Sequence, residues 1–181
     1  YPVEAARLTQ AAHVDVTEHD ACGVGMVAAL DGVARREVVQ AGIDALRAVW
    51  HRGAVDADGK TGDGAGIHIE IPQDFFAEAV ERGGDRLRPG PIGVGMVFLS
   101  KTDFGAQERC RQIVEVEILN AGYNIYGWRQ VPIDVSCIGE KANATRPEIE
   151  QILIWDPENR EPALMERDLY VIRRRIEKQA I

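Results

Sequence analysis

The sequence predicts a domain of mixed α and β class. Segments with the 3.6-residue period of helices alternate along the chain with segments that are continuously apolar or have the two-residue period of strands. No internal repeat interrupts this alternation, and the 181 residues suit one domain with a core of its own. Propensity alone leaves open whether the strands form a parallel doubly wound sheet or an antiparallel sandwich.

The first part of the chain predicts a leader, a strand and a helix. Residues 1–21 have weak periodicity and end in a polar run, so we expect them to lie outside the core. Residues 22–30 are apolar and end at the turn signal Asp31-Gly32, which predicts a buried strand. An amphipathic helix is predicted over residues 36–50. Its apolar positions recur at helical spacing: Val39, Ile43, Leu46 and Trp50.

A loop and a second strand are expected next. Residues 51–66 are rich in glycine and aspartate, which predicts turns and unusual backbone angles. Residues 67–71 alternate isoleucine with polar side chains, a pattern typical of a half-buried strand. Residues 73–81 are predicted to be helical, and residues 82–91 form a connector rich in glycine.

The second half begins with an apolar strand over residues 92–99. Asp103 is a candidate N-cap for a long helix that ends at Gly122. Residues 123–135 are expected to be extended. Beyond them the sequence gives two short apolar runs without a clear assignment: residues 152–155 and 169–172.

Composition and charge exclude several classes of protein. With 45% hydrophobic and 28% charged residues, the chain is neither disordered nor fibrous in type. A formal net charge of −8 argues against sequence-independent binding to nucleic acid, and the basic run at residues 173–175 does not reverse this. The longest apolar runs are far shorter than the roughly 20 residues that span a membrane.

Three cysteines, Cys22, Cys110 and Cys137, are an odd number without CxxC spacing. This argues against a disulfide framework and against a zinc site, so we expect no metal in this chain and a reducing cytoplasm around it. Residues 1–21 also lack the apolar stretch of a secretory signal. The chain begins with Tyr1 and stops at Ile181 within a charged, periodic segment, so we interpret it as a fragment.

Five stretches carry a resemblance to one family. They are Cys22-Gly23-Val24-Gly25, His51-Arg52-Gly53-Ala54, Thr61-Gly62-Asp63-Gly64-Ala65-Gly66, Tyr126-Gly127-Trp128-Arg129 and the run from Gly139 to Pro147. In this order and spacing they resemble the glutamine amidotransferase domain of the glutamate synthase large-subunit family. The resemblance covers nearly everything from Cys22 onward.

The resemblance implies an incomplete α+β domain with the four-layer αββα fold of N-terminal-nucleophile hydrolases. Residues 1–21 would then be a propeptide, and residues 22–181 the N-terminal part of the amidotransferase domain. In such enzymes the first residue of the mature chain is the catalytic cysteine. A thiol of pKa about 8.5 needs a nearby base, and a free α-amine of pKa about 7.7 to 8.0 supplies one on the same residue.

The implied site has Cys22 as the catalytic nucleophile, which attacks the glutamine amide, releases ammonia and leaves a thioester for water to cleave. The residues expected to shape the site around it are Gly23, Arg52, Gly53, Asp63 and Gly64. Each has a simpler interpretation as well. Glycine in a strand can mark a bulge, and Arg52 with Gly53 can end the preceding helix. The glycine-rich loop lacks the pattern of a phosphate-binding loop.

For the other two cysteines, Cys110 and Cys137, a small core residue is the default interpretation. In the family the oxyanion donors come from an Asn-Gly pair farther along the chain, which this sequence lacks, so the fragment alone is expected to be inactive. The parent enzyme implied would pass ammonia to a downstream synthase domain that makes glutamate from 2-oxoglutarate. Its cofactors would be FMN and an iron–sulfur cluster, with NADPH and FAD on a small subunit, and none of them in this fragment.

Two alternatives stay open from the sequence. Another class II amidotransferase would share Cys22 and the fold. A non-enzymatic interaction domain would not use the thiol at all.

Overall fold

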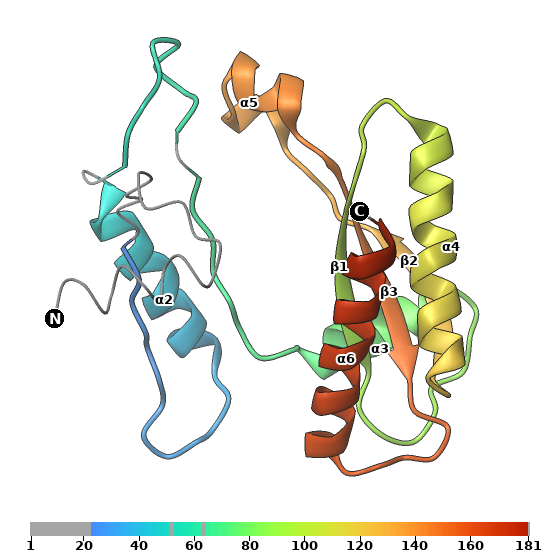
Figure 1. Cartoon of the computed structure of the whole chain (residues 1–181). Coiled ribbons are helices and arrows are strands. Elements are labelled where there is room, and N and C mark those ends of the chain that lie inside the picture. The colour runs from blue at the N-terminus through green and yellow to red at the C-terminus, as the bar shows by residue number, and fades with distance from the viewer. Residues whose placement is uncertain (1–22, 51–52, 63, 181) are drawn as a thin grey trace, which may run out of the picture. The chain divides into compact units, whose positions relative to one another are not determined.

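The computed structural model describes residues 23–50, 53–62 and 64–180 (Figure 1). The chain divides into two compact units. The first contains the described residues up to Ala54 together with residues 64–67. The second contains Val55–Gly62 and the described residues from His68 onward. In sequence, the short segment Val55–Gly62 of the second unit thus lies between two parts of the first unit, and the rest of the second unit follows from His68.

The first unit is built around one helix, α2 (Arg36–Ala48). Glu37 in its first turn and Arg47 in its last turn complement the helix dipole. This confirms the helix predicted over residues 36–50, with an end two residues earlier. None of its residues is buried.

Both strands predicted for the first half of the chain are wrong in the described residues. Residues 23–29 and residues 67–71 have no strand assignment, although their sequences are apolar or alternating. The side chains of Val24 and Met26 are 94% and 91% exposed. A strand needs a neighbouring strand to accept its backbone hydrogen bonds, and no described strand pairs with either segment.

The second unit contains most of the secondary structure. Its helices are α3 (Gln73–Arg82), α4 (Phe104–Asn120), α5 (Glu140–Thr145) and α6 (Pro162–Ala180), with the short 3₁₀ helix η2 (Val135–Cys137). Its strands are β1 (Gly93–Leu99), β2 (Asn124–Gln130) and β3 (Glu148–Trp155). The helix predicted over residues 73–81 and the strand predicted over residues 92–99 are confirmed to within one residue at each end. The two apolar runs left unassigned lie in β3 and α6.

The three strands form an antiparallel sheet in the order β1-β3-β2. Because both outer strands run opposite to β3, β1 and β2 are parallel to each other, and α4 crosses over between them. This is a split β-α-β arrangement. The register runs from Gly93 opposite Ile154 to Leu99 opposite Glu148 in one pair, and a bulge at Ile125 and Gly127 interrupts the other.

Apolar side chains cover both faces of the sheet. On one face α4 and α6 pack through Val114, Ile118, Met165 and Ile172 against Ile152 and Ile154 of β3. On the other face α3 packs through Phe76 and Val80 against Leu153. Figure 1 shows α4 and α6 lying along the sheet. Successive residues of β3 point to opposite faces, so the central strand is buried from both sides.

Local signals account for the limits of α4. The Asp103 side chain accepts a hydrogen bond from the backbone nitrogen of Ala106 at 2.8 Å, which confirms the predicted N-cap. Gly122, just beyond the helix, has a φ of 85°. Cys110, predicted to be a small core residue, is half-buried on α4 and is a member of neither apolar cluster, whereas Cys137 is exposed on η2. That second assignment is wrong because η2 lies outside both apolar clusters.

Candidate active site

The predicted nucleophile, Cys22, lies outside the described residues, as do Arg52 and Asp63. Gly23 is the first residue described. It is exposed, and a side chain added there would meet no atom of the described chain within 4 Å. No described residue therefore covers the backbone that follows the predicted nucleophile.

Gly53 closes the turn that follows α2. Its backbone nitrogen donates to the carbonyl oxygen of Trp50 at 3.1 Å. This places Gly53 shortly after the end of α2, and its part in shaping a site stays a prediction.

Gly64 needs to be glycine for a backbone reason. Its φ is 86°, a left-handed conformation that residues with a Cβ atom adopt only with strain. Gly23, Gly53 and Gly64 belong to the first unit, so the described members of the predicted site share one compact unit. The positive φ of Gly64 fits the unusual backbone angles that the sequence predicts for residues 51–66.

The hairpin Val55–Gly62 leads directly into that loop. Val55 and Gly62 form an antiparallel bridge, and the Asp56 nitrogen donates to the Thr61 oxygen at 2.7 Å. At the tip, the Asp58 carboxylate accepts from the backbone nitrogens of Lys60 and Thr61 at 2.9 and 2.7 Å. It also accepts from the Thr61 hydroxyl at 2.5 Å. The turn is therefore organised around one carboxylate.

These donors lower the pKa of Asp58 from its ordinary value of 3.8 to about 2. The Thr61 hydroxyl contributes most, followed by the two backbone nitrogens, and the charge of Lys141 adds a smaller effect. Each donor favours the ionised form because it bonds to the charged oxygens. The hairpin tip thus keeps its negative charge throughout the neutral range.

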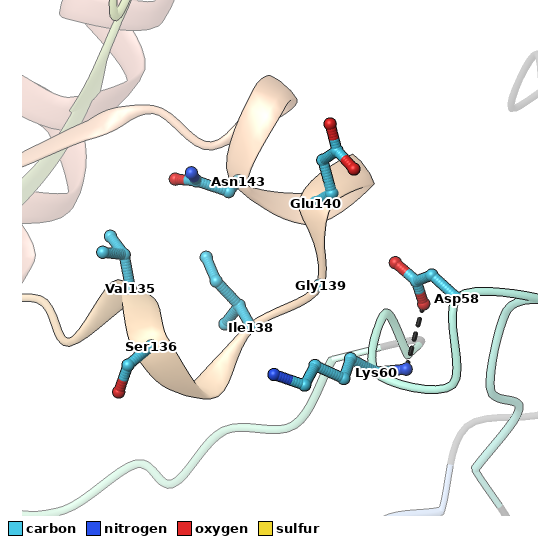
Figure 2. Close-up of a pocket in the computed structure, with 8 residues that line it drawn as sticks. All are labelled: Asp58, Lys60, Val135, Ser136, Ile138, Gly139, Glu140 and Asn143. Atoms are coloured by element: carbon cyan, nitrogen blue, oxygen red, sulfur yellow. Dashed lines mark hydrogen bonds between the residues drawn. The ribbon is translucent and has the colours of Figure 1, made fainter.

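A cavity of about 530 Å³ lies where this hairpin meets α5 and η2. Figure 2 shows it between the hairpin residues Asp58 and Lys60 and the segment from Val135 to Asn143. Its lining is mixed: Asp58, Lys60, Val135, Ser136, Ile138, Gly139, Glu140 and Asn143. The cavity is formed entirely within the second unit.

Sequence reasoning missed the contact that builds this junction. The segment that starts at Gly139 contributed to the family resemblance, and nothing in its composition indicates that it packs on residues 56–61. The two segments lie about 80 positions apart in the chain, so no local pattern links them. The Asp58-Gly59 turn signal was the only local indication of the hairpin.

Comparison with known proteins gives one family and a consistent set of relatives. The family profile of class II glutamine amidotransferases matches residues 22–181. The large chain of the glutamate synthase [NADPH] of Azospirillum brasilense is 60% identical over 179 residues. Ferredoxin-dependent glutamate synthases are also similar, with 37% identity for the Arabidopsis thaliana enzyme 1 and 38% for the Synechocystis enzyme 2.

Each of these matches includes nearly all of this chain but only a small part of the relative. The Azospirillum match includes 98% of this chain but 12% of the relative, and the other two include about nine tenths of this chain and 10% of each relative. The chain thus spans about a tenth of the length of the relatives it matches. The family match begins at Cys22, whereas the Azospirillum match also includes most of the preceding segment.

Proposed function

Because the chain belongs to the class II glutamine amidotransferases, we propose that it is the front part of the glutaminase domain of a glutamate synthase. The observation that carries this is 60% identity to one such large chain over 98% of the sequence. Its substrate is glutamine, and its product ammonia serves glutamate biosynthesis and ammonia assimilation. The proposed fold is the incomplete four-layer αββα N-terminal-nucleophile domain, which the helices and the antiparallel sheet of the described residues fit.

The chemistry assigned to Cys22 needs its own α-amine. The sulfur attacks the side-chain carbonyl carbon of glutamine, and the amine takes the thiol proton and passes it to the departing nitrogen. Ammonia leaves, and a glutamyl thioester remains on the sulfur. Water then attacks the thioester, which releases glutamate and restores the thiol.

This use of the amine requires that the Ala21–Cys22 bond be cut, since an amide nitrogen has no useful basicity. We therefore assign residues 1–21 as a propeptide. The start of the family match at Cys22 supports this boundary. The exposed backbone at Gly23 is compatible with substrate access to the residue before it.

The cofactors of the parent reaction belong elsewhere in the protein. An iron–sulfur cluster is held by cysteine thiolates, usually four, and this chain has three cysteines without ligand spacing. The residues here do not fit the cluster. We assign FMN and the cluster to a downstream synthase domain, and FAD with NADPH to a small subunit. The NADPH donor follows the name of the Azospirillum relative.

No described helix is long and apolar enough to cross a membrane. We propose a cytoplasmic location, which the free thiols of Cys110 and Cys137 support.

Replacing Cys22 tests the proposal in the full-length protein. Cys22→Ala is expected to abolish glutamine-dependent glutamate synthesis, because the nucleophile is lost, and to leave ammonia-dependent synthesis intact. Both rates are measured on the same preparation, with Cys110→Ala as the matched control for loss of a thiol. Unchanged glutamine use would favour a non-enzymatic interaction domain. Glutamine-dependent formation of a different product would favour another class II enzyme.

A further inference from the structure

The junction between the hairpin and α5 is held by a pair of charges far apart in sequence. The Lys141 ammonium donates to both carboxylate oxygens of Asp56, at 2.9 and 2.8 Å. The Lys141 side chain is 65% exposed and that of Asp56 36%. Water therefore screens the pair, and its contribution to the junction is modest.

The backbone of Gly139 makes the closer contact. A Cβ atom at this position would lie 2.1 Å from the Thr61 hydroxyl oxygen and 2.3 Å from a carboxylate oxygen of Asp58. It would also lie 2.6 Å from the backbone nitrogen of Thr61. The Thr61 hydroxyl and the Thr61 backbone nitrogen both donate hydrogen bonds to the Asp58 carboxylate, so the three groups are linked at the hairpin tip. They cannot move aside singly, so only glycine fits here.

The α5 segment is in turn fixed to the sheet. Lys101, just after β1, donates from its ammonium to the backbone oxygen of Asn143 at 2.9 Å. Arg146 donates to the side-chain oxygen of Asn143 at 3.0 Å, and it pairs with Glu148 at the start of β3 at 3.3 Å. A continuous series of contacts thus runs from the sheet through α5 to the hairpin.

The hairpin ends where the predicted site begins. Gly62 is bridged to Val55, and the next residues in the sequence are Asp63 and Gly64. In sequence, the hairpin is therefore the segment that leads into the glycine-rich loop.

We propose that Gly139 and Lys141 are positioning residues for glutamine use, which hold the hairpin that precedes the loop with Asp63 and Gly64 in the sequence. The proposal rests on the proposed function. Neither residue is assigned contact with the substrate. Their effect passes through Thr61 and Asp56, the hairpin residues they contact.

The test uses the full-length protein and two activities measured side by side. Glutamine-dependent synthesis requires the loop to be in place, whereas ammonia-dependent synthesis bypasses it and reports whether the rest of the enzyme is folded. The variants are Gly139→Ala, Lys141→Ala, Lys141→Arg and Asp56→Ala. The matched controls are Gly105→Ala, where an added Cβ meets only a flexible arginine end at 3.3 Å and an Asp103 oxygen at 3.4 Å, and the exposed Lys178→Ala.

Gly139→Ala is expected to lower kcat/KM for glutamine about ten- to a hundredfold, since overpacking must displace the hairpin. The loss should fall mainly on KM for glutamine. Lys141→Ala should lower kcat/KM about two- to fivefold, in the range of an exposed ion pair, and Lys141→Arg should restore it. Asp56→Ala should match Lys141→Ala, and the double variant should add nothing further. Ammonia-dependent rates and both controls should stay within about twofold of wild type.

Unchanged glutamine kinetics in a soluble Gly139→Ala enzyme would overturn the proposal. So would an equal loss of both activities in Lys141→Ala, which would show a purely structural effect. If Gly139→Ala fails to fold, the exposed Lys141 and Asp56 variants decide the matter. Cys22→Ala distinguishes failure of the proposed function from failure of the positioning inference. If this variant uses glutamine as well as wild type does, the proposed function itself is wrong. If Cys22→Ala loses glutamine use but the Gly139, Lys141 and Asp56 variants keep normal glutamine kinetics, only the positioning inference is wrong.

Discussion

The two units differ in what their apolar residues contact. In the second unit Tyr123 and Ile152 are 1% and 2% exposed, enclosed between helices and sheet. In the first unit Met26 is 91% exposed and no residue of α2 is buried. Both units contain apolar, strand-like runs, yet among the described residues β1, β2 and β3 of the second unit pair into a sheet, whereas residues 23–29 and 67–71 do not. An apolar pattern therefore forms a strand only when a neighbouring strand pairs with it and other side chains pack against its face.

The contrast between the two units predicts its largest effect on the free energy of unfolding. Ile152→Ala removes a fully buried side chain at the centre of the sheet and is expected to cost about 2 to 5 kcal/mol of unfolding free energy. Met26→Ala removes an exposed side chain and should change it by less than about 0.5 kcal/mol. Denaturant unfolding measures the two variants, followed by tryptophan fluorescence from Trp50 in the first unit and from Trp128 and Trp155 in the second.

This contrast between the two units would be contradicted if Ile152→Ala and Met26→Ala lowered the free energy of unfolding equally. A large effect of Met26→Ala would mean that residues 23–30 pack against a core in solution. A small effect of Ile152→Ala would mean that the sheet is not the stable centre of the second unit.

A smaller effect concerns the hairpin, the part of the second unit that interrupts the first in sequence. Thr61→Val removes the hydroxyl that contributes most to the lowered pKa of Asp58, so that pKa should rise from about 2 toward its ordinary value. Titration of the Asp58 carboxyl carbon by NMR measures it. Ser136→Ala is the matched control, because the Ser136 hydroxyl lowers the pKa of Asp134 and does not contact Asp58.

The lowered pKa of Asp58 determines how the stability of the hairpin depends on pH. The ionised Asp58 carboxylate stabilises the hairpin at any pH above its ordinary value of 3.8, and this contribution is lost as the pH falls toward 2. In Thr61→Val the loss should begin at a higher pH. An unchanged titration in that variant would show that the hydroxyl does not organise the turn.

Helices were the part of the fold that the sequence predicted best. The α4 helix has its own start signal in Asp103 and its own end signal in Gly122, and α2 has a clear apolar period. These signals act within a few residues, so they can be recognised locally. The α6 helix was left unassigned, although its apolar positions recur at helical spacing: Met165, Leu169, Ile172 and Ile176.

Long-range contacts were the part that the sequence could not supply. Residues 23–29 have the pattern of a buried strand, but the pattern does not state whether a partner is present. The contact of Gly139 with Thr61 joins segments that no local rule connects. Within the candidate site, Gly64 was predicted as a turn residue and its positive φ gives the reason. The functions of Cys22, Arg52 and Asp63 stay predictions, since these residues lie outside the described part of the chain.

The N-terminus of the active enzyme tests the central claim most directly. The full-length protein is purified in a form that turns over glutamine, and its intact mass and N-terminal sequence are determined. We predict a mature chain that begins at Cys22 with a free α-amine and lacks residues 1–21. An enzyme that hydrolyses glutamine at its full rate while it retains those residues would contradict the account.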